Sequence, residues 1–457
     1  MFSIKQFQKV VFLLIVLPLV HSCGQPQPSA VRDSNGGAHP EWTRDANVYE
    51  VNIRQYTPEG TFKAFQKHLP RLDSMGVEIL WLMPIHPIGK KKRKGKLGSY
   101  YSIRDYKAVN PNFGTEQDFK QLVEAAHDRD MKLIIDWVPN HTAWDHPWVQ
   151  EHPEFYAKDS TGAITYEADW TDIALLNYDD KGLWPEMIDA MKYWVREAGI
   201  DGFRVDHAAH EIPMAFWEQA IPEVNGLKKG LFWLAEWNDP KLHPLFDASY
   251  TWDYFHLATS IAKGAEPVDA ITEYIQKEDS LYPKSAYRMY FTTNHDENSW
   301  KGTDEELYGD NFENFAVMAA TIDGIPLIYS GQETGLDQRL EFFKKDTIDW
   351  DGYEYESFYA TLLKLKKNNQ ALWNGQYGGD FEALQTNGDN VYAYRRIKGG
   401  DEILIVLNFS DESQSVEVTG FENQADYRNV FEPGETVTIP GKNLMLGAHR
   451  YLVFEKQ

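Results

Sequence analysis

Three acidic side chains stand at the ends of predicted β-strands, where catalytic groups are often assembled. Asp206 ends the segment Gly-Phe-Arg-Val-Asp, Glu236 ends Leu-Ala-Glu, and Asp296 ends Thr-Asn-His-Asp. Two carboxyl groups that face one glycosidic bond can cleave it, one as an ionised nucleophile and the other as a proton donor. A single acid at a strand end more often caps a turn or pairs with a cation, so this interpretation depends on the three occurring together.

The neighbours of these acids predict which of them is ionised. Arg204 precedes Asp206 by two residues, so a strand would point both side chains to the same side. A guanidinium beside a carboxylate keeps it ionised, which is what a nucleophile requires. Glu236 lies between Trp233 and Trp237, and burial together with nearby carboxylates would raise its pKa. We therefore predict Asp206 as the nucleophile and Glu236 as the proton carrier.

The elements that must position these residues follow a repeating pattern. From about Asn47, short apolar runs typical of strands alternate with amphipathic helical stretches such as Thr115–Arg129 and Lys181–Ala198. Eight such units predict an α/β fold, a (β/α)8 TIM barrel, in which active-site residues follow the strands at one end. The expected strands are Val48–Ile53, Val77–Met83, Lys132–Asp136, Gly202–Asp206, Leu231–Glu236, Asp247–Asp253, Met289–Asn294 and Pro326–Tyr329.

Two further units are expected around the barrel, which is assigned to residues 41–372. Residues 141–179, after the third strand, predict a short insertion subdomain on the catalytic face, and its small size indicates an open cleft. After a helix at Glu354–Asn369, residues 373–457 predict a C-terminal all-β sandwich. Its expected strands are Val391–Ile397, Glu402–Phe409, Ser415–Thr419, Thr436–Ile439 and Tyr451–Glu455.

Composition limits the partners. The chain has 457 residues and a net charge of −24, which argues against nucleic acid, while 14% aromatic residues suit the apolar faces of sugars. No organic cofactor and no particular oligomeric state are indicated. The single basic run, Lys90–Lys96, has three possible interpretations: a solvated loop, a site for an anionic partner, or the rim of a substrate channel.

The N-terminus reads as an export signal. Lys5 and Lys9 precede the apolar run Val10–Val20, which is too short to span a bilayer, so residues 1–23 are predicted to be a signal peptide. Cys23 is the only cysteine, and its context resembles a bacterial lipobox, which predicts a lipid anchor; the alternative is cleavage nearby with loss of Cys23. Residues 24–40 predict a flexible tether without an acidic cluster. We expect an exported protein attached to a bacterial membrane, on the periplasmic side rather than the cell surface.

Four short segments resemble the signature regions of the α-amylase family, glycoside hydrolase family 13. They are DWVPNH at 136–141, GFRVDHAAH at 202–210, LAEW around Glu236 and FTTNHD at 291–296. The resemblance extends from Val48 to the C-terminus. It implies that Asp206 is the nucleophile, Glu236 the general acid/base and Asp296 the third carboxylate. It also implies that the sugar is contacted by Tyr101, His141, Arg204 and His295.

The function implied by the resemblance is retaining hydrolysis of α-1,4-glucosidic bonds in starch or maltodextrins, with either endo action or action on oligosaccharides. Two alternatives use the same residues: a glucanotransferase acting on maltooligosaccharides, and an amylase-like protein that binds glycans with little catalysis. A third alternative, from another class, is a zinc hydrolase with His141, His207, His210, His295 and Asp206 as ligands. The zinc hypothesis is weakened by Arg204, which would crowd a cation, and by the lack of a His-x-His pair on the first strand.

The resemblance also implies a calcium site. Its ligands would be Asn140, Asp172 and the backbone oxygen of His210, and hard oxygen ligands suit Ca²⁺. Ala209 stands where the family often has lysine, and few other acidic ligands accompany Asp172. In the alternative interpretation, Asn140 only forms hydrogen bonds with its own loop.

Overall fold

The structure is a computed structural model that describes residues 39–434 and 436–457. The predicted signal peptide, Cys23 and most of the predicted tether lie outside the described residues, so the predictions made for them stay predictions. Within the described ranges, no helix combines the length and the apolar character needed to cross a membrane.

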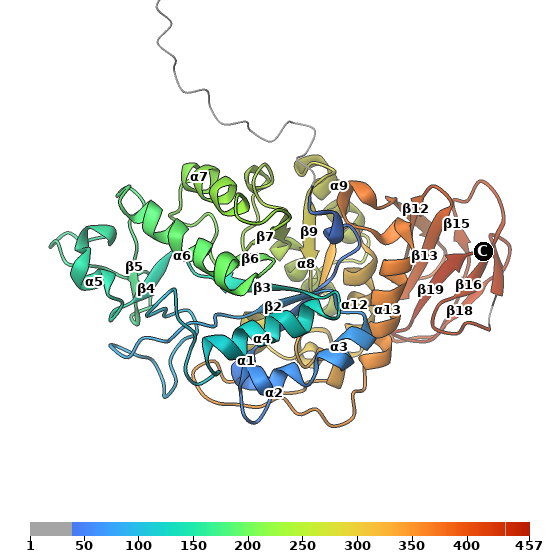
Figure 1. The fold of residues 1–457 in the computed structure, drawn as a ribbon. Coiled ribbons are helices and arrows are strands. Elements are labelled where there is room, and N and C mark those ends of the chain that lie inside the picture. Colours follow the sequence, from blue (N-terminus) through green and yellow to red (C-terminus); the bar gives the residue numbers. More distant parts are fainter. Residues whose placement is uncertain (1–38, 435) are drawn as a thin grey trace, which may run out of the picture.

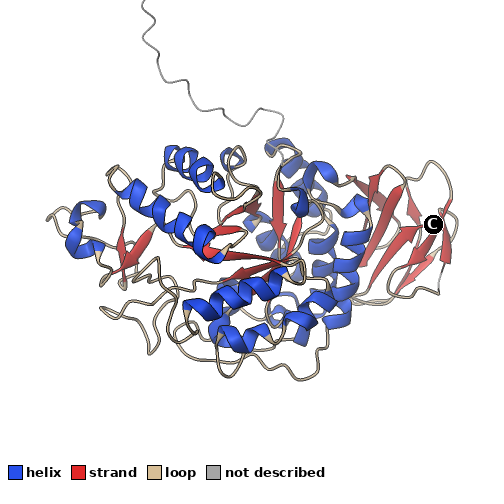
Figure 2. Ribbon diagram, viewed as in Figure 1, coloured by secondary structure: helices blue, strands red, loops and turns tan. Residues whose placement is uncertain are grey.

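Eight parallel strands close into a barrel surrounded by helices (Figures 1 and 2). Around the barrel the order is β1, β2, β3, β6, β7, β8, β9, β10, and β10 pairs with β1 to complete it. The predicted fold class is confirmed, and all eight expected strands are present. Their bounds are β1 Val48–Val51, β2 Ile79–Leu82, β3 Lys132–Trp137, β6 Gly202–Val205, β7 Phe232–Ala235, β8 Ala248–Tyr250, β9 Tyr287–Tyr290 and β10 Ile325–Tyr329.

One glycine allows the two strands that carry Asp206 and Glu236 to lie close together. Gly202 begins β6 with a φ of 154°, and a Cβ there would lie 1.9 Å from the carbonyl oxygen of Phe232 in β7. A larger residue would push the strands apart, because that contact is with backbone. Gly202 therefore helps to set the separation between the ends of β6 and β7.

The helices bury an apolar stripe against the barrel. In α4, for example, Thr115 and Asp118 form a capping box at the N-terminus, while Phe119, Leu122 and Ala126 are buried. The helices are α1 Ile53–Tyr56, α2 Phe62–Gln66, α3 Leu69–Met75, α4 Glu116–His127, α5 Trp148–Glu151, α6 Leu183–Ala198, α7 Met214–Asn225, α8 Trp252–Ala262, α9 Ala270–Leu281, α10 His295–Trp300, α11 Asp304–Tyr308, α12 Phe312–Thr321 and α13 Glu356–Asn368.

The insertion after β3 is a small unit with its own two-stranded sheet. Strand β4, His141–Ala143, pairs antiparallel with β5, Ile173–Leu175, and α5 lies between them in the chain. In Figure 1 this unit projects from the side of the barrel opposite the C-terminal domain. The pairing of His141 with Leu175 fixes His141 at the junction of barrel and insertion.

The C-terminal domain is a sandwich of unequal layers. A seven-stranded antiparallel sheet in the order β15-β11-β12-β13-β19-β16-β17 carries a two-stranded sheet, β14-β18, on one face. Leu404 and Phe454 of the large sheet pack against Leu444 and Leu446 of the small one, while Ile405 belongs to the barrel core. The strands are β11 Asp380–Thr386, β12 Val391–Lys398, β13 Asp401–Asn408, β14 Gln414–Val416, β15 Val418–Thr419, β16 Ala425–Asn429, β17 Thr436–Ile439, β18 Leu444–Leu446 and β19 Tyr451–Lys456.

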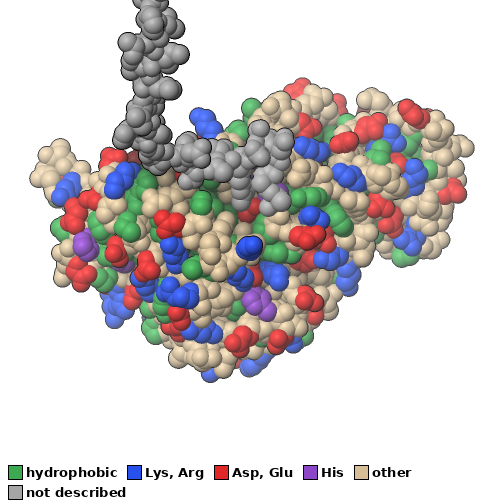
Figure 3. Space-filling model, turned by 45° about the horizontal axis from the view of Figure 1, so that its top comes forward, with side chains coloured by type: hydrophobic (Ala, Val, Ile, Leu, Met, Phe, Trp, Pro, Cys, Tyr) green, Lys and Arg blue, Asp and Glu red, His purple; other side chains and the backbone are tan. Residues whose placement is uncertain are grey.

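The surface does not gather the net negative charge into one area on the face shown in Figure 3. Acidic and basic side chains are interspersed there, as is usual for a soluble surface.

Candidate active site

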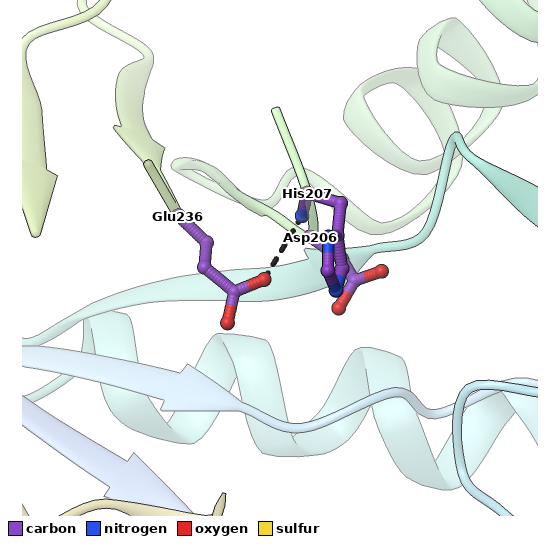
Figure 4. A group of neighbouring side chains, drawn as sticks. All are labelled: Asp206, His207 and Glu236. Carbon is purple, nitrogen blue, oxygen red and sulfur yellow. Dashed lines mark hydrogen bonds between the residues drawn. The ribbon is translucent and has the colours of Figure 1, made fainter. Parts of the chain in front are cut away.

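The three predicted catalytic carboxylates lie at one end of the barrel. Asp206 follows β6, Glu236 follows β7, and Asp296 lies in the first turn of α10 after β9. Figure 4 shows Asp206 and Glu236 extending from neighbouring strand ends, and ligand atoms of Asp206, His207 and Glu236 lie within 4.8 Å of one another. Asp206 and Glu236 are buried, whereas the side chain of Asp296 is 39% exposed. Asp206 and Asp296 line a cavity of about 360 Å³.

Arg204 holds three carboxylates together. Its guanidinium lies 3.0 Å from Asp136, 3.1 Å from Asp206 and 2.5 Å from Glu236, and the side chain is completely buried. A buried cation of this kind is stabilised only if its hydrogen-bonding capacity is used by paired anions. Because one positive charge faces three negative ones, at least one carboxyl group of the cluster favours its protonated form.

The surroundings of Asp206 and Glu236 shift their pKa values in the directions opposite to those predicted from the sequence. Burial raises the pKa of Asp206 well above its usual value, and the charge of Glu236 adds to the effect. Burial also acts to raise the pKa of Glu236, but Arg204, His207 and His295 together outweigh it and lower that pKa. The pKa of Asp136 rises to about 6, again chiefly through burial. The pKa shifts of Asp206 and Glu236 therefore run opposite to the directions predicted from the sequence, and the two carboxyl groups titrate as one interacting pair.

Two distances explain the reversal. The guanidinium of Arg204 is closer to Glu236 than to Asp206, and the backbone N–H of His207 donates to Glu236 at 2.9 Å, the bond drawn in Figure 4. Trp233, which was expected to flank Glu236, instead packs on Phe203 on the outer side of the strands and donates to Asn225. The carboxylate of Glu236 thus has hydrogen-bond donors beside it, where an apolar pocket was expected.

Tyr101 and His295 form a chain of hydrogen bonds behind the cavity. The hydroxyl of Tyr101 lies 2.7 Å from Nε2 of His295 and donates to Asp136 at 3.1 Å, and the two rings stack. On its other side, Nδ1 of His295 donates to Glu50 at 2.5 Å. Burial lowers the pKa of His295, but Asp296 and Glu50 outweigh it and raise that pKa to about 9. His295 is therefore a cation that faces Asp296 across 3.6 Å.

Glu50 is a functional residue that the reading of the sequence missed. It is a fully buried carboxylate in β1, where every other residue is apolar or aromatic. A charged residue inside a buried strand was the available signal, because such a group requires a partner. That partner is His295.

His141 also reaches the cavity, as predicted. It lines the same wall as Tyr101, and its Nδ1 bonds Oδ1 of Asn140 at 3.1 Å. Burial lowers the pKa of His141 to about 3, so the ring is neutral and offers a neutral hydrogen-bonding edge.

The remaining walls come from the basic run after β2, from the insertion after β3, and from aromatic residues of α10 and of the segment after β10. Trp300 is 54% exposed and its ring lies 5.5 Å from that of Phe342. Such an exposed aromatic surface beside carboxylates suits the apolar face of a sugar ring. The other wall residues that were not named individually as site residues are Lys94, from the predicted basic run, Asp169, Trp170 and Ile173, from the predicted insertion, and Ser99 and Phe343.

The residues predicted for calcium are already paired with protein groups. The side-chain amide of Asn140 donates to the carbonyl oxygen of His210 at 3.1 Å, and the carboxylate of Asp172 lies 3.6 Å from the ammonium of Lys94. A cation would have to displace both partners, so this set does not fit Ca²⁺, which requires six to eight oxygen ligands.

Removal of divalent cations tests this conclusion. We expect dialysis against EDTA to leave both the activity and the Tm unchanged, because Lys94 already neutralises Asp172. Differential scanning fluorimetry and initial rates, each measured with and without added Ca²⁺, check the result. A loss of Tm that Ca²⁺ alone restores would show that calcium binds after all.

The zinc set considered from sequence is not assembled. His295 is held by Glu50 and His210 by Glu167, so neither ring is available to share an ion with Asp206. Across the described ranges, the one group of three such side chains with ligand atoms close together is Asp206, His207 and Glu236.

Comparison with known proteins agrees with this geometry. Residues 27–170 match the family model "Alpha amylase, catalytic domain", and residues 381–453 match "Maltogenic Amylase, C-terminal domain". A solved maltogenic α-amylase, AmyB from Thermotoga neapolitana, is 30% identical; the match covers 90% of this chain and 98% of that one, with a TM-score of 0.82. An α-amylase structure from Lactobacillus plantarum is 28% identical over 91% of this chain and 99% of that one, also with a TM-score of 0.82.

Two curated relatives are longer proteins. α-Amylase MalA of Haloarcula japonica is 29% identical over 88% of this chain, and the α-1,4-glucan:maltose-1-phosphate maltosyltransferase of Picrophilus torridus is 29% identical over 81% of it. The chain spans 61% of the length of each. Taken with the barrel, the clustered carboxylates and the match over nearly the whole length of AmyB, these likenesses show that the chain belongs to the α-amylase family.

Proposed function

We propose that the protein hydrolyses α-1,4-glucosidic bonds of starch or maltodextrins with retention of the anomeric configuration. The observation that carries the proposal is the closeness of Asp206 and Glu236, whose ligand atoms lie within 4.8 Å of each other. Retaining glycosidases hold their carboxyl groups about 5–5.5 Å apart, whereas inverting enzymes need about 6.5–9.5 Å to admit a water molecule. The close approach of Asp206 and Glu236 therefore favours retention.

In this reaction Asp206 acts as the nucleophile and Glu236 as the general acid and base. Oδ1 of Asp206 is bound to Arg204, whereas the buried Oδ2 has no hydrogen-bond partner among the described residues, and in the proposed reaction it attacks the anomeric carbon. Glu236 donates a proton to the departing oxygen and then, as a base, activates the water that releases the glycosyl enzyme. Because Arg204 and the backbone N–H of His207 stabilise the ionised form of Glu236, bound substrate must favour its protonated form before it can donate. Moving Glu236 away from Arg204 would raise its pKa and achieve this.

The decisive experiment follows the products of maltoheptaose by proton NMR during the first minutes of reaction. The proposal requires shorter maltooligosaccharides whose new reducing ends are initially in the α configuration. Products that first appear in the β configuration would exclude the double displacement.

Transfer to a sugar acceptor is a second candidate, because one relative is named as a maltosyltransferase. Hydrolysis and transfer share the glycosyl enzyme and differ only in what attacks it. At high maltoheptaose concentration, a transferase would produce oligomers longer than the substrate. Binding without either product would indicate the glycan-binding alternative.

A further inference from the structure

Lys94, in the basic run Lys90–Lys96, forms part of the wall of the cavity. Lys94 donates from Nζ to the carbonyl oxygen of Asp169 at 2.6 Å and lies 3.6 Å from the carboxylate of Asp172. Both aspartates belong to the insertion, and all three residues line the cavity. The loop after β2 and the insertion after β3 are therefore joined across the edge of the cleft, which differs from the open cleft expected from the short insertion.

Contacts with the insertion hold the first half of this loop. The ammonium of Lys92 lies 3.4 Å from the centre of the Trp144 ring, and the backbone N–H of Lys90 donates to Asp145 at 3.0 Å. Arg93 donates to the carbonyl oxygen of Gly89 at 2.6 Å. The side chains of Lys92 and Arg93 are therefore used in contacts within the protein and are not free to bind an anion.

The second half of the loop meets the segment between β10 and α13. The backbone N–H of Leu97 donates to the carbonyl oxygen of Phe343 at 3.1 Å, and a Cβ on Gly95 would lie 2.5 Å from the Phe343 side chain. One continuous wall thus runs from the insertion through Lys94 to Phe343.

The order of strands shows which end of the substrate this wall faces. In the closed barrel β1 stands opposite β7, and β2 and β10 flank β1. Glu236, at the end of β7, protonates the leaving group in the proposed reaction, so the departing chain lies on its side. The part of the wall formed by the loops after β2 and β10, which includes Lys94, stands across the mouth from Glu236 and faces the sugar that remains bound to Asp206.

We propose that Lys94 closes the non-reducing end of the cleft, so that the enzyme acts near the non-reducing ends of α-glucan chains and releases short maltooligosaccharides. This inference rests on the proposed function and names its substrate more narrowly. The cavity, at about 360 Å³, is near the lower end of the range for small-ligand sites, about 300–1,000 Å³. A long glucan would have to pass through the position held by Lys94 and Asp169.

The test compares maltoheptaose with the same oligosaccharide blocked at its non-reducing end by a 4,6-ethylidene group. The wild type should cleave the blocked substrate with a kcat/KM at least about 10-fold lower. Lys94→Met retains the apolar stem but removes the charged hydrogen bond, and should raise the blocked-to-unblocked ratio about 10-fold, the effect of one such bond. Product lengths from amylose, measured by anion-exchange chromatography, should increase in parallel.

Lys91→Met is the matched control, because Lys91 is exposed in the same loop and has no ion pair or side-chain hydrogen bond with any described residue. Its ratio should equal that of the wild type. A wild type that cleaves both substrates equally well overturns the inference without needing any variant, and an unchanged ratio in a folded Lys94→Met protein does so too. Failure to cleave either substrate would instead refute the proposed function itself.

Discussion

Asp206→Asn will lower kcat for maltoheptaose by about 10⁴–10⁶-fold, the range typical for removal of a catalytic nucleophile. The amide has nearly the same shape and can still accept a hydrogen bond from Arg204, but it cannot form the glycosyl enzyme. The unpartnered Oδ2 of Asp206 is the atom whose loss is decisive. Release of reducing sugar, followed over hours at high enzyme concentration, measures the residual rate.

Chemical rescue separates loss of the nucleophile from loss of folding. In Asp206→Gly, azide can enter the space left by the carboxylate and attack the anomeric carbon, giving a glycosyl azide of β configuration. Asp73→Asn, which removes an exposed carboxylate on α3, is the control and should keep full activity. An Asp206→Asn enzyme within about 10-fold of the wild-type rate would show that another group attacks.

The barrel could be predicted because parallel strands that are buried on both faces have short, continuous apolar sequences, and these alternate with amphipathic helical segments. Even the short strand Ala248–Tyr250 could be placed, since the repeat required a strand there. Strands Asp380–Thr386 and Ala425–Asn429 were missed because most of their residues are exposed or half-buried. Each of these strands pairs with a neighbour on both sides, and strands that depend on such pairing carry little local apolar signal.

The positions of the catalytic carboxyl groups could be predicted from the sequence, but the directions of their pKa shifts could not. Strand ends are set by the fold, so Asp206, Glu236 and Asp296 had to converge once the barrel was recognised. The direction in which the pKa of each carboxyl group shifts depends instead on its surroundings, including how closely Arg204 approaches it, 2.5 Å for Glu236 and 3.1 Å for Asp206, and no spacing in a sequence encodes that difference. The loop residue Lys94 was visible as charge, but its partner Asp169 lies 75 residues away.

Glu236→Gln will lower kcat for maltoheptaose by about 10²–10⁴-fold, the usual contribution of a general acid or base. The first step with maltosyl fluoride should be much less affected, because fluoride departs without a proton. Comparing single-turnover rates for the two substrates therefore isolates protonation of the leaving group from binding. Equal losses with both substrates would argue that Glu236 acts in positioning instead.

The pH dependence of the same variant follows from the shifts in the pair. Activity requires one proton shared by Asp206 and Glu236, so the wild type should lose activity at high pH, when the raised pKa of the pair is passed, and at low pH, when both groups are protonated. In Glu236→Gln only Asp206 titrates, and activity requires its ionised form. The basic limb should disappear, and the remaining acidic limb should lie below the wild-type basic limb, because the charge of Glu236 no longer raises the pKa of Asp206.

A second buried acid makes the control for this profile essential. Glu297 follows Asp296, and burial, with the charge of Asp296 adding to it, raises its pKa to about 7, where it could produce a basic limb of its own. Glu297→Gln should keep the bell-shaped profile, because Glu297 is not one of the acids that Arg204 binds beside the cavity. If the basic limb vanished in Glu297→Gln and persisted in Glu236→Gln, the proton donor would be sought beside Asp296. If the basic limb persists in Glu297→Gln and is lost in Glu236→Gln, the titrating proton belongs to the Asp206–Glu236 pair.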